Sequence, residues 1–429
     1  MGLLLVVLFL IGTILGRFLN RCIDQFWRHE QLADQLKSVI PGTEIYLRTA
    51  PRFWRRENIP IIGSMGASSL RKYPKRDAFV EILNGVLLAA LYWWMIPAGA
   101  EATIKESGVF STQWGFSLPD ATAATYLKPT IWLHLWYLYL VVMIESLIVA
   151  SFIDFEWQII PDGCTVPAMI VGVLGGWLLE RAYLAPIWFQ NPDLLEVYAQ
   201  FLPVWLEPLL HGPRMPEWIR QDSSFPGLAT SLAGWAVGGV IIWMIRIIGG
   251  WILRREAMGF GDVILMAMIG SFIGWQASVI VFFLAPMCGA GMALFVRLFK
   301  GEGAIPYGPY LALGTVVLLF GWQVIWPFVE EYFQLGALIP ILAVSMFAAM
   351  ALMLQVLQIG KMALGISIEE EVIREGEWSS ADQLHYFEGE QEDPNQGKWF
   401  SDHNTRWPGV ESGRGRLYYE QWKRGHHWK

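Results

Sequence analysis

The chain has 429 residues, of which 54% are hydrophobic and 16% are charged, and it contains 23 tryptophans. This composition excludes an ordinary soluble domain and indicates a polytopic membrane protein. The formal net charge of −7 is spread unevenly, and no basic patch of the kind that binds nucleic acid is present, so no nucleic-acid partner is expected.

Nine apolar segments are read as membrane helices, because a bilayer core of about 30 Å needs roughly 17 to 25 apolar residues per helix. They lie near residues 2–19, 79–98, 131–153, 164–183, 227–252, 262–276, 278–297, 308–329 and 336–359. The predicted fold class is an all-α, polytopic membrane helix bundle in the lipid bilayer. It has eight to nine transmembrane helices, eight if the first lies shallow. The first segment lacks a preceding basic region, so we expect it to be retained rather than cleaved as a signal peptide.

Lysines and arginines predict the orientation of the bundle. Twelve of them lie between residues 17 and 77, whereas residues 99–130 carry only two. The positive-inside rule therefore predicts a cytoplasmic first loop and an N-terminus on the outside. The four expected parts are the first transmembrane helix (1–19), a cytoplasmic loop subdomain (20–78), the transmembrane core (79–359) and a polar C-terminal cytoplasmic tail (360–429).

Two acids stand where predicted helices meet the cytoplasmic edge of the membrane. Asp154 ends an inward-running helix in "SFIDFEWQIIPDG", and Asp262 begins an outward-running helix in "EAMGFGDVILM". An ionisable residue at such a position costs several kcal/mol unless it is paired or wetted, which makes each acid a functional hypothesis. Gly259 and Gly261 remove side-chain bulk on both sides of Phe260 and permit a close backbone approach. We expect Asp154 and Asp262 to meet.

A pair of carboxyl groups at hydrogen-bonding distance has a defined chemistry. The two cannot both ionise freely, so they share a proton. The ionised partner can take a proton from water while the protonated partner donates one to a scissile carbonyl, as in aspartic proteases. A lone acid at a helix end can instead be solvated by headgroup water, and for either acid alone that reading stays open.

Five ordered motifs lie between residues 11 and 315: "GRFLNRCI", "ENIPIIG" with "RKYP…VEILNG", "IDFEWQIIPD", "EAMGFGD" and "AIPYGPYLALG". With these motifs the sequence resembles the type IV prepilin peptidases, which are membrane aspartic proteases of the GxGD type. The resemblance implies an endopeptidase that removes the basic leader from type IV prepilins or type II secretion pseudopilins at the cytoplasmic face of the bacterial inner membrane. It also implies that Asp154 and Asp262 are the catalytic pair.

Asp162 is the rival for the first catalytic position. In the family pattern the acid that opens the "D…IPD" segment is the catalytic one, and Asp162 corresponds to the acid that Asn can replace. From the residues alone, Pro161 and Asp162 look like the turn and N-cap of the next helix. Asp154 is therefore preferred, and Pro161 and Asp162 are assigned supporting roles together with Gly259 and Gly261.

The sequence departs from the family pattern in three places, and two of these affect the expected cofactors. Many members bind zinc through two CxxC pairs in the first loop, but this loop contains only Cys22, so zinc is not expected. The family also N-methylates the new N-terminus from S-adenosylmethionine, and here "KRDAF" is inserted in the region tied to that activity. Methylation is thus the less firm of the two implied activities. Ile264 stands where the family usually has Lys.

Two other functions compete with the peptidase. A proton-coupled transporter could use Asp154, Asp262, Glu145 and His134 as a relay, but transporters of this size often show inverted repeats and midplane acids, and neither is evident in this sequence. A catalytically silent assembly protein of a pilus or secretion apparatus also fits the missing Lys and Cys residues and the long tail. Cleavage of a prepilin would separate these readings.

Overall fold

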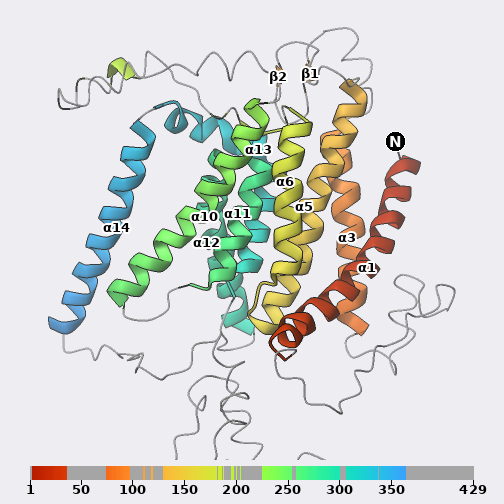
Figure 1. Cartoon of the computed structure of the whole chain (residues 1–429), viewed down its shortest axis with the longest axis horizontal. Helices are drawn as coiled ribbons and strands as arrows, with labels where there is room; N and C mark the ends of the chain where they lie inside the picture. The colour runs from red at the N-terminus through yellow and green to blue at the C-terminus, as the bar shows by residue number, and fades with distance from the viewer. Residues whose placement is uncertain are drawn as a thin grey trace, which may run out of the picture.

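The structure is a computed structural model of the chain. It describes residues 2–35, 74–96, 110–111, 117–118, 129–180, 182–185, 187, 195–197, 200, 203, 225–253, 258–299, 306–336 and 338–363. Nine apolar helices stand side by side in this part of the chain (Figure 1). They are α1 (Gly2–Gln35), α3 (Pro74–Met95), α5 (Pro129–Trp157), α6 (Asp162–Leu178), α10 (Phe225–Leu253), α11 (Phe260–Ile273), α12 (Trp275–Phe299), α13 (Gly308–Phe333) and α14 (Leu338–Ala363). The strands β1 (Phe110–Ser111) and β2 (Ser117–Leu118) form a short antiparallel pair.

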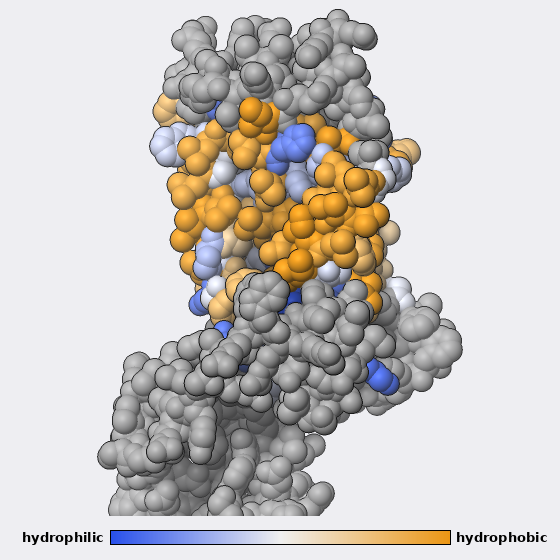
Figure 2. Space-filling view, turned by 90° about the vertical axis from the view of Figure 1, so that its right-hand side faces the viewer, coloured by the Kyte–Doolittle hydropathy of each residue, from blue (hydrophilic) through white to orange (hydrophobic). Residues whose placement is uncertain are grey.

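The predicted all-α membrane bundle is confirmed. Six of the helices, α1, α3, α5, α10, α13 and α14, are long and apolar enough to cross a membrane, and α6, α11 and α12 are shorter apolar helices. Large apolar side chains are exposed along most of them, and Figure 2 shows them gathered on the outside of the described helices. Such a surface is stable in lipid rather than in water.

The first helix is longer than predicted. α1 continues to Gln35 instead of ending near residue 19. The turn that follows residue 19 still packs on other helices, mainly on α3, since Leu19, Cys22 and Ile23 are buried. The predicted cytoplasmic loop of residues 20–78 thus begins as helix, and α3 starts at Pro74. Residues 36–73 of that loop and residues 364–429 of the predicted tail lie outside the described residues.

The direction of the helices positions the site. Successive helices from α3 to α14 alternate in direction, so the end of α5 and the starts of α6, α11 and α13 all lie at the end of the bundle that is drawn lowest in Figure 1. We call this the lower end. The alternation agrees with the prediction that Asp154 and Asp262 lie at the same depth.

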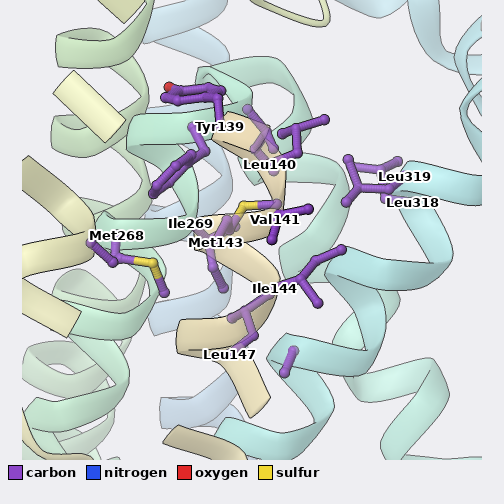
Figure 3. Close-up of a cluster of buried hydrophobic side chains, with 14 of the residues drawn as sticks. Tyr139, Leu140, Val141, Met143, Ile144, Leu147, Met268, Ile269, Leu318 and Leu319 are labelled. Carbon is purple, nitrogen blue, oxygen red and sulfur yellow. The ribbon is translucent and has the colours of Figure 1, made fainter. Parts of the chain in front are cut away.

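The core is built around α5. Figure 3 shows side chains of α5 facing those of α11 and α13, and all the labelled residues are buried: Tyr139, Leu140, Val141, Met143, Ile144, Leu147, Met268, Ile269, Leu318 and Leu319. The hydroxyl of Tyr139 also donates to the backbone oxygens of Gly172, at 2.7 Å, and Ser271, at 3.2 Å. This packing fixes α11 and α13 against α5, and with them the segments of the site.

Candidate active site

The candidate site is made by three short segments at the lower end of the bundle. They are the end of α5 with the turn that follows it (154–162), the start of α11 (259–262) and the start of α13 (306–308). The segments meet at Ile160: a Cβ added at Gly261 would lie 2.9 Å from the Ile160 Cβ, and one added at Gly308 would lie 3.1 Å from the Ile160 Cδ1. Glycine at 261 and 308 therefore lets the three segments approach this closely.

Asp154 lies in the last turn of α5 and is only 6% exposed. Its Oδ2 atom accepts a hydrogen bond of 3.0 Å from the backbone N–H of Gly308. A Cβ at position 308 would stand 2.5 Å from this same oxygen. The start of α13 thus supplies both a donor to Asp154 and the space that its carboxyl group occupies.

Asp262 lies in the first turn of α11 and is 8% exposed. The extended backbone of Gly259 precedes the helix and lies beside the Asp262 carboxyl group, so that a Cβ added at Gly259 would be 3.7 Å from Asp262 Oδ2. The charge on Asp154 acts on Asp262. The two acids singled out in the sequence are therefore both buried at one end of the bundle and within electrostatic reach of one another.

Asp162 has a different environment. It is exposed and is the first residue of α6, and the N-cap position belongs to Pro161, one residue earlier than predicted. The reason is that the Pro161 backbone is extended, with φ −77° and ψ 135°, while its carbonyl oxygen already accepts from Cys164 N and Thr165 Oγ1. The prediction of an Asp162 N-cap was wrong by one position, whereas the turn at Pro161 is confirmed.

The structure adds an ion-pair cluster beside Asp154 that the sequence analysis missed. Nη1 of Arg76, in the first turn of α3, donates to both carboxylate oxygens of Glu156 at 2.9 and 3.0 Å, and Nη2 donates to Asp24 of α1 at 2.8 Å. Glu156 follows Asp154 by two residues. Arg76 thus ties α1 and α3 to the last turn of α5. The sequence signal for this cluster was one basic and two acidic residues, each close to an end of an apolar run.

Tyr307 and Gly308 are the other missed residues. In the sequence, "AIPYGPYLALG" stands out only as a motif of the resembled family, and neither residue has a predicted role. The structure brings both to the acids: the Gly308 amide contacts Asp154, and the charge on Asp262 acts on the Tyr307 phenol. A Gly-Pro pair opening an apolar helix was the available signal.

His134 and Glu145, the two α5 residues considered above as part of a proton relay, contact side chains of α3. His134 Nε2 lies 3.1 Å from the Tyr92 hydroxyl, and Glu145 Oε1 accepts from Asn84 Nδ2 at 2.9 Å. These hydrogen bonds give His134 and Glu145 a part in holding α5 against α3. Among the described residues, no group of three or more His, Cys, Asp or Glu side chains could hold a metal ion, and residues 36–73 of the first loop lie outside the described residues.

Comparison with known proteins finds a family match for the region that contains Asp262. Residues 218–294, which include Asp262, match the model of the "Type IV leader peptidase family". This stretch is similar to that family. The resemblance inferred from the sequence motifs is confirmed for it, and α10, α11 and much of α12 fall inside the match.

Curated relatives extend the similarity. The chain is 30% identical over 154 residues to a "Type 4 prepilin-like proteins leader peptide-processing enzyme" of Escherichia coli O78:H11, covering 36% of this chain and 55% of the relative. It is 25% identical over 175 residues to a "Prepilin leader peptidase/N-methyltransferase" of Pseudomonas putida, covering 39% and 60%. Over 145 residues it is 32% identical to the Pseudomonas aeruginosa protein of that name, covering 31% and 46%. The matches thus span about half the length of these relatives. No solved structure matches the chain.

Proposed function

We propose that this protein is a membrane aspartic endopeptidase of the GxGD type that cleaves the leader peptide from type IV prepilins or pseudopilins. The observation that carries the proposal is the pair of buried acids, Asp154 and Asp262, at one end of the bundle and within electrostatic reach of each other. The similarity of residues 218–294, which include Asp262, to the Type IV leader peptidase family supports it. The names of the curated relatives give the substrate class.

The two carboxyl groups have distinct environments, which suggests their roles. The Gly308 amide donates to Asp154, and an amide N–H favours a carboxylate over a carboxylic acid. We therefore assign Asp154 as the ionised general base and Asp262 as the protonated general acid. The pair titrates as a unit, so the assignment describes the state that starts the reaction.

The reaction then follows in two balanced steps. Asp154 takes a proton from a water molecule whose oxygen adds to the scissile carbonyl carbon, and Asp262 gives its proton to the carbonyl oxygen. The tetrahedral intermediate collapses when the amide nitrogen receives a proton from Asp154 and the C–N bond breaks. In the same step Asp262 takes back a proton from a hydroxyl group of the intermediate, which restores the carbonyl and returns both acids to their starting protonation.

The place of the acids suggests how the substrate approaches. Both lie where helices end, so a polar leader can reach them from the aqueous side while an apolar stem stays among the membrane helices. From the distribution of Lys and Arg, we propose that the protein lies in a bacterial inner membrane with its N-terminus outside. The lower end of the bundle then faces the cytoplasm. A prepilin or pseudopilin with a basic leader fits that side.

Methylation of the new N-terminus from S-adenosylmethionine is a further expectation. It rests on the resemblance and on the names of relatives such as the Pseudomonas putida protein. The "KRDAF" insertion in the region tied to that activity, residues 75–79, forms the start of α3. Peptidase activity is therefore the proposed function, and the product assay can test methylation at the same time.

The test is co-expression with a candidate prepilin and mass measurement of the product's N-terminus. The wild-type protein should remove the leader, and Asp154→Asn and Asp262→Asn should each abolish cleavage while still inserting in the membrane. Asp162→Asn should keep much of the activity, because its side chain is exposed at the start of α6. Full activity of Asp262→Asn would end the peptidase proposal, and an inactive wild type with intact insertion would favour the assembly-protein reading.

A further inference from the structure

A tyrosine hydroxyl is buried next to the two acids and has no assigned role. Tyr307 immediately precedes Gly308, the residue whose amide binds Asp154. Its side chain packs against the main hydrophobic core. Its hydroxyl oxygen is buried and has no hydrogen-bond partner among the residues that the structure describes. A buried hydroxyl without a partner costs about 1 to 3 kcal/mol, and a catalytic role is one recognised reason for a protein to keep one.

The backbone holds Tyr307 firmly in place. It is the N-cap residue of α13, with φ −82° and ψ −29°. Its carbonyl oxygen accepts from the backbone N–H of Tyr310 at 3.0 Å and of Leu311 at 3.2 Å. The ring is therefore fixed at the start of a packed helix, which is the preorganisation that an active-site donor needs.

The surroundings make the hydroxyl a donor. Burial raises the pKa of the Tyr307 phenol, and the charge on Asp262 raises it further. The phenol therefore stays protonated and cannot act as a base at any physiological pH. Because the hydroxyl makes no hydrogen bond to Asp262 within the described structure, its proton remains available to a group that enters the site.

We propose that the Tyr307 hydroxyl binds the oxygen of the scissile carbonyl and stabilises the partial negative charge that this oxygen carries while water attacks and the proton of Asp262 is still being transferred to it. The inference rests on the proposed peptidase function and adds a third catalytic residue to it. The backbone N–H of the neighbouring Gly308 is already bound to Asp154, so the Tyr307 hydroxyl is the donor left for the substrate. Two neighbouring residues would thus serve both parts of the reaction: Tyr307 binds the substrate oxygen, and Gly308 orients Asp154, the proposed base.

The test is Tyr307→Phe, which removes only the hydroxyl and keeps the ring in the core. Cleavage of one peptide substrate is followed at several concentrations. The expected result is a fall in kcat of about 10² to 10³, the range found when one oxyanion donor is lost, with little change in KM. Tyr310→Phe is the matched control: it removes a hydroxyl one helical turn further along α13, where the ring packs against Gly289, and its kcat should equal that of the wild type.

Two further measurements separate this role from others. A pH–rate profile that keeps its shape in Tyr307→Phe supports the donor role, whereas a displaced profile with wild-type kcat at its new optimum would mean that the hydroxyl only tunes Asp262, and would overturn it. Replacing Tyr307 by fluorotyrosines of rising acidity keeps the ring and strengthens the donor, so kcat should follow the acidity; no dependence would also overturn the proposal. If the wild-type protein cleaves and Tyr307→Phe cleaves equally well, only this inference fails, whereas the proposed function fails if the wild type does not cleave.

Discussion

The backbone N–H of Gly308 donates a 3.0 Å hydrogen bond to Oδ2 of Asp154, and the two residues are 154 positions apart in the chain. This bond joins the end of α5 to the start of α13. It explains why the late "IPYGP" segment belongs to the candidate site although it contains no acid, because it delivers a donor to Asp154 and leaves room for the Asp154 carboxyl group.

The first prediction concerns that room. Gly308→Ala would place a Cβ 2.5 Å from Asp154 Oδ2, closer than any real contact, and 3.1 Å from Ile160. Asp154 or the start of α13 must move, and displacement of a catalytic group by about 1 Å can cost about 10² in rate. We expect kcat for leader cleavage to fall by roughly that factor. Gly291→Ala, where a Cβ meets nothing within 4 Å, should leave it unchanged; equal activity of the two variants would contradict the geometry.

The second prediction concerns the ion pairs of Arg76. Arg76→Lys keeps the charge but loses the planar fork that binds both oxygens of Glu156. Because Glu156 is 24% exposed, the loss of stability should be modest, about 1 kcal/mol. We expect a thermal midpoint lower by a few degrees and a several-fold slower cleavage, since Glu156 belongs to the same last turn as Asp154.

Two matched variants check this assignment. Glu156→Gln should reproduce much of the effect of Arg76→Lys, and combining the two should add little to either alone. Asp24→Asn should change stability less, because its side chain is 52% exposed. Additive effects of Arg76→Lys and Glu156→Gln would show that their pairing does not support the end of α5.

The third prediction is that a chelator leaves leader cleavage intact. An acid pair activates water without a metal, and residues 20–78 contain no CxxC pair. Activity of the purified protein should be the same before and after dialysis against chelator, and metal analysis should find no stoichiometric zinc. Inactivation that added zinc reverses would reveal a zinc site built without CxxC pairs.

Sequence patterns were sufficient for most of the fold. Helices in lipid are marked by long apolar runs, so the nine predicted segments correspond to the nine apolar helices of the described residues. Apolarity, however, does not mark where a helix ends in water. α1 continues to Gln35, and the turn that follows residue 19 still packs on other helices, mainly on α3.

The candidate site was predictable only where chemistry is visible in a single residue. Asp154 and Asp262 stand out as acids at the ends of apolar runs, and two alternating helices bring them to one end of the bundle. Gly308 and Tyr307 act through the backbone and through one hydroxyl, and their approach to the acids depends on how α13 packs on α5. Pairing across 154 residues has no local signature, and neither does the contact between Arg76 and Glu156.

The last prediction concerns the buried ion pair between α1 and α3. Nη1 of Arg17 lies 3.2 Å from Oε1 of Glu81, and both side chains are almost inaccessible, at 7% and 0% exposure. Removing one member of such a pair leaves an uncompensated charge in an apolar interior, which costs about 3 to 5 kcal/mol, whereas replacing both by apolar residues is often neutral or stabilising.

We therefore expect Arg17→Met and Glu81→Leu each to lower the thermal midpoint in detergent by many degrees, and the double variant to recover most of the loss. The double variant should also keep leader cleavage, because Asp154, Asp262 and Tyr307 lie on α5, α11 and α13 or next to them. If stability recovers but cleavage does not, the pair has a role in the reaction beyond holding α1 to α3. If the two losses simply add, Arg17 and Glu81 stabilise the bundle through separate partners and not through each other.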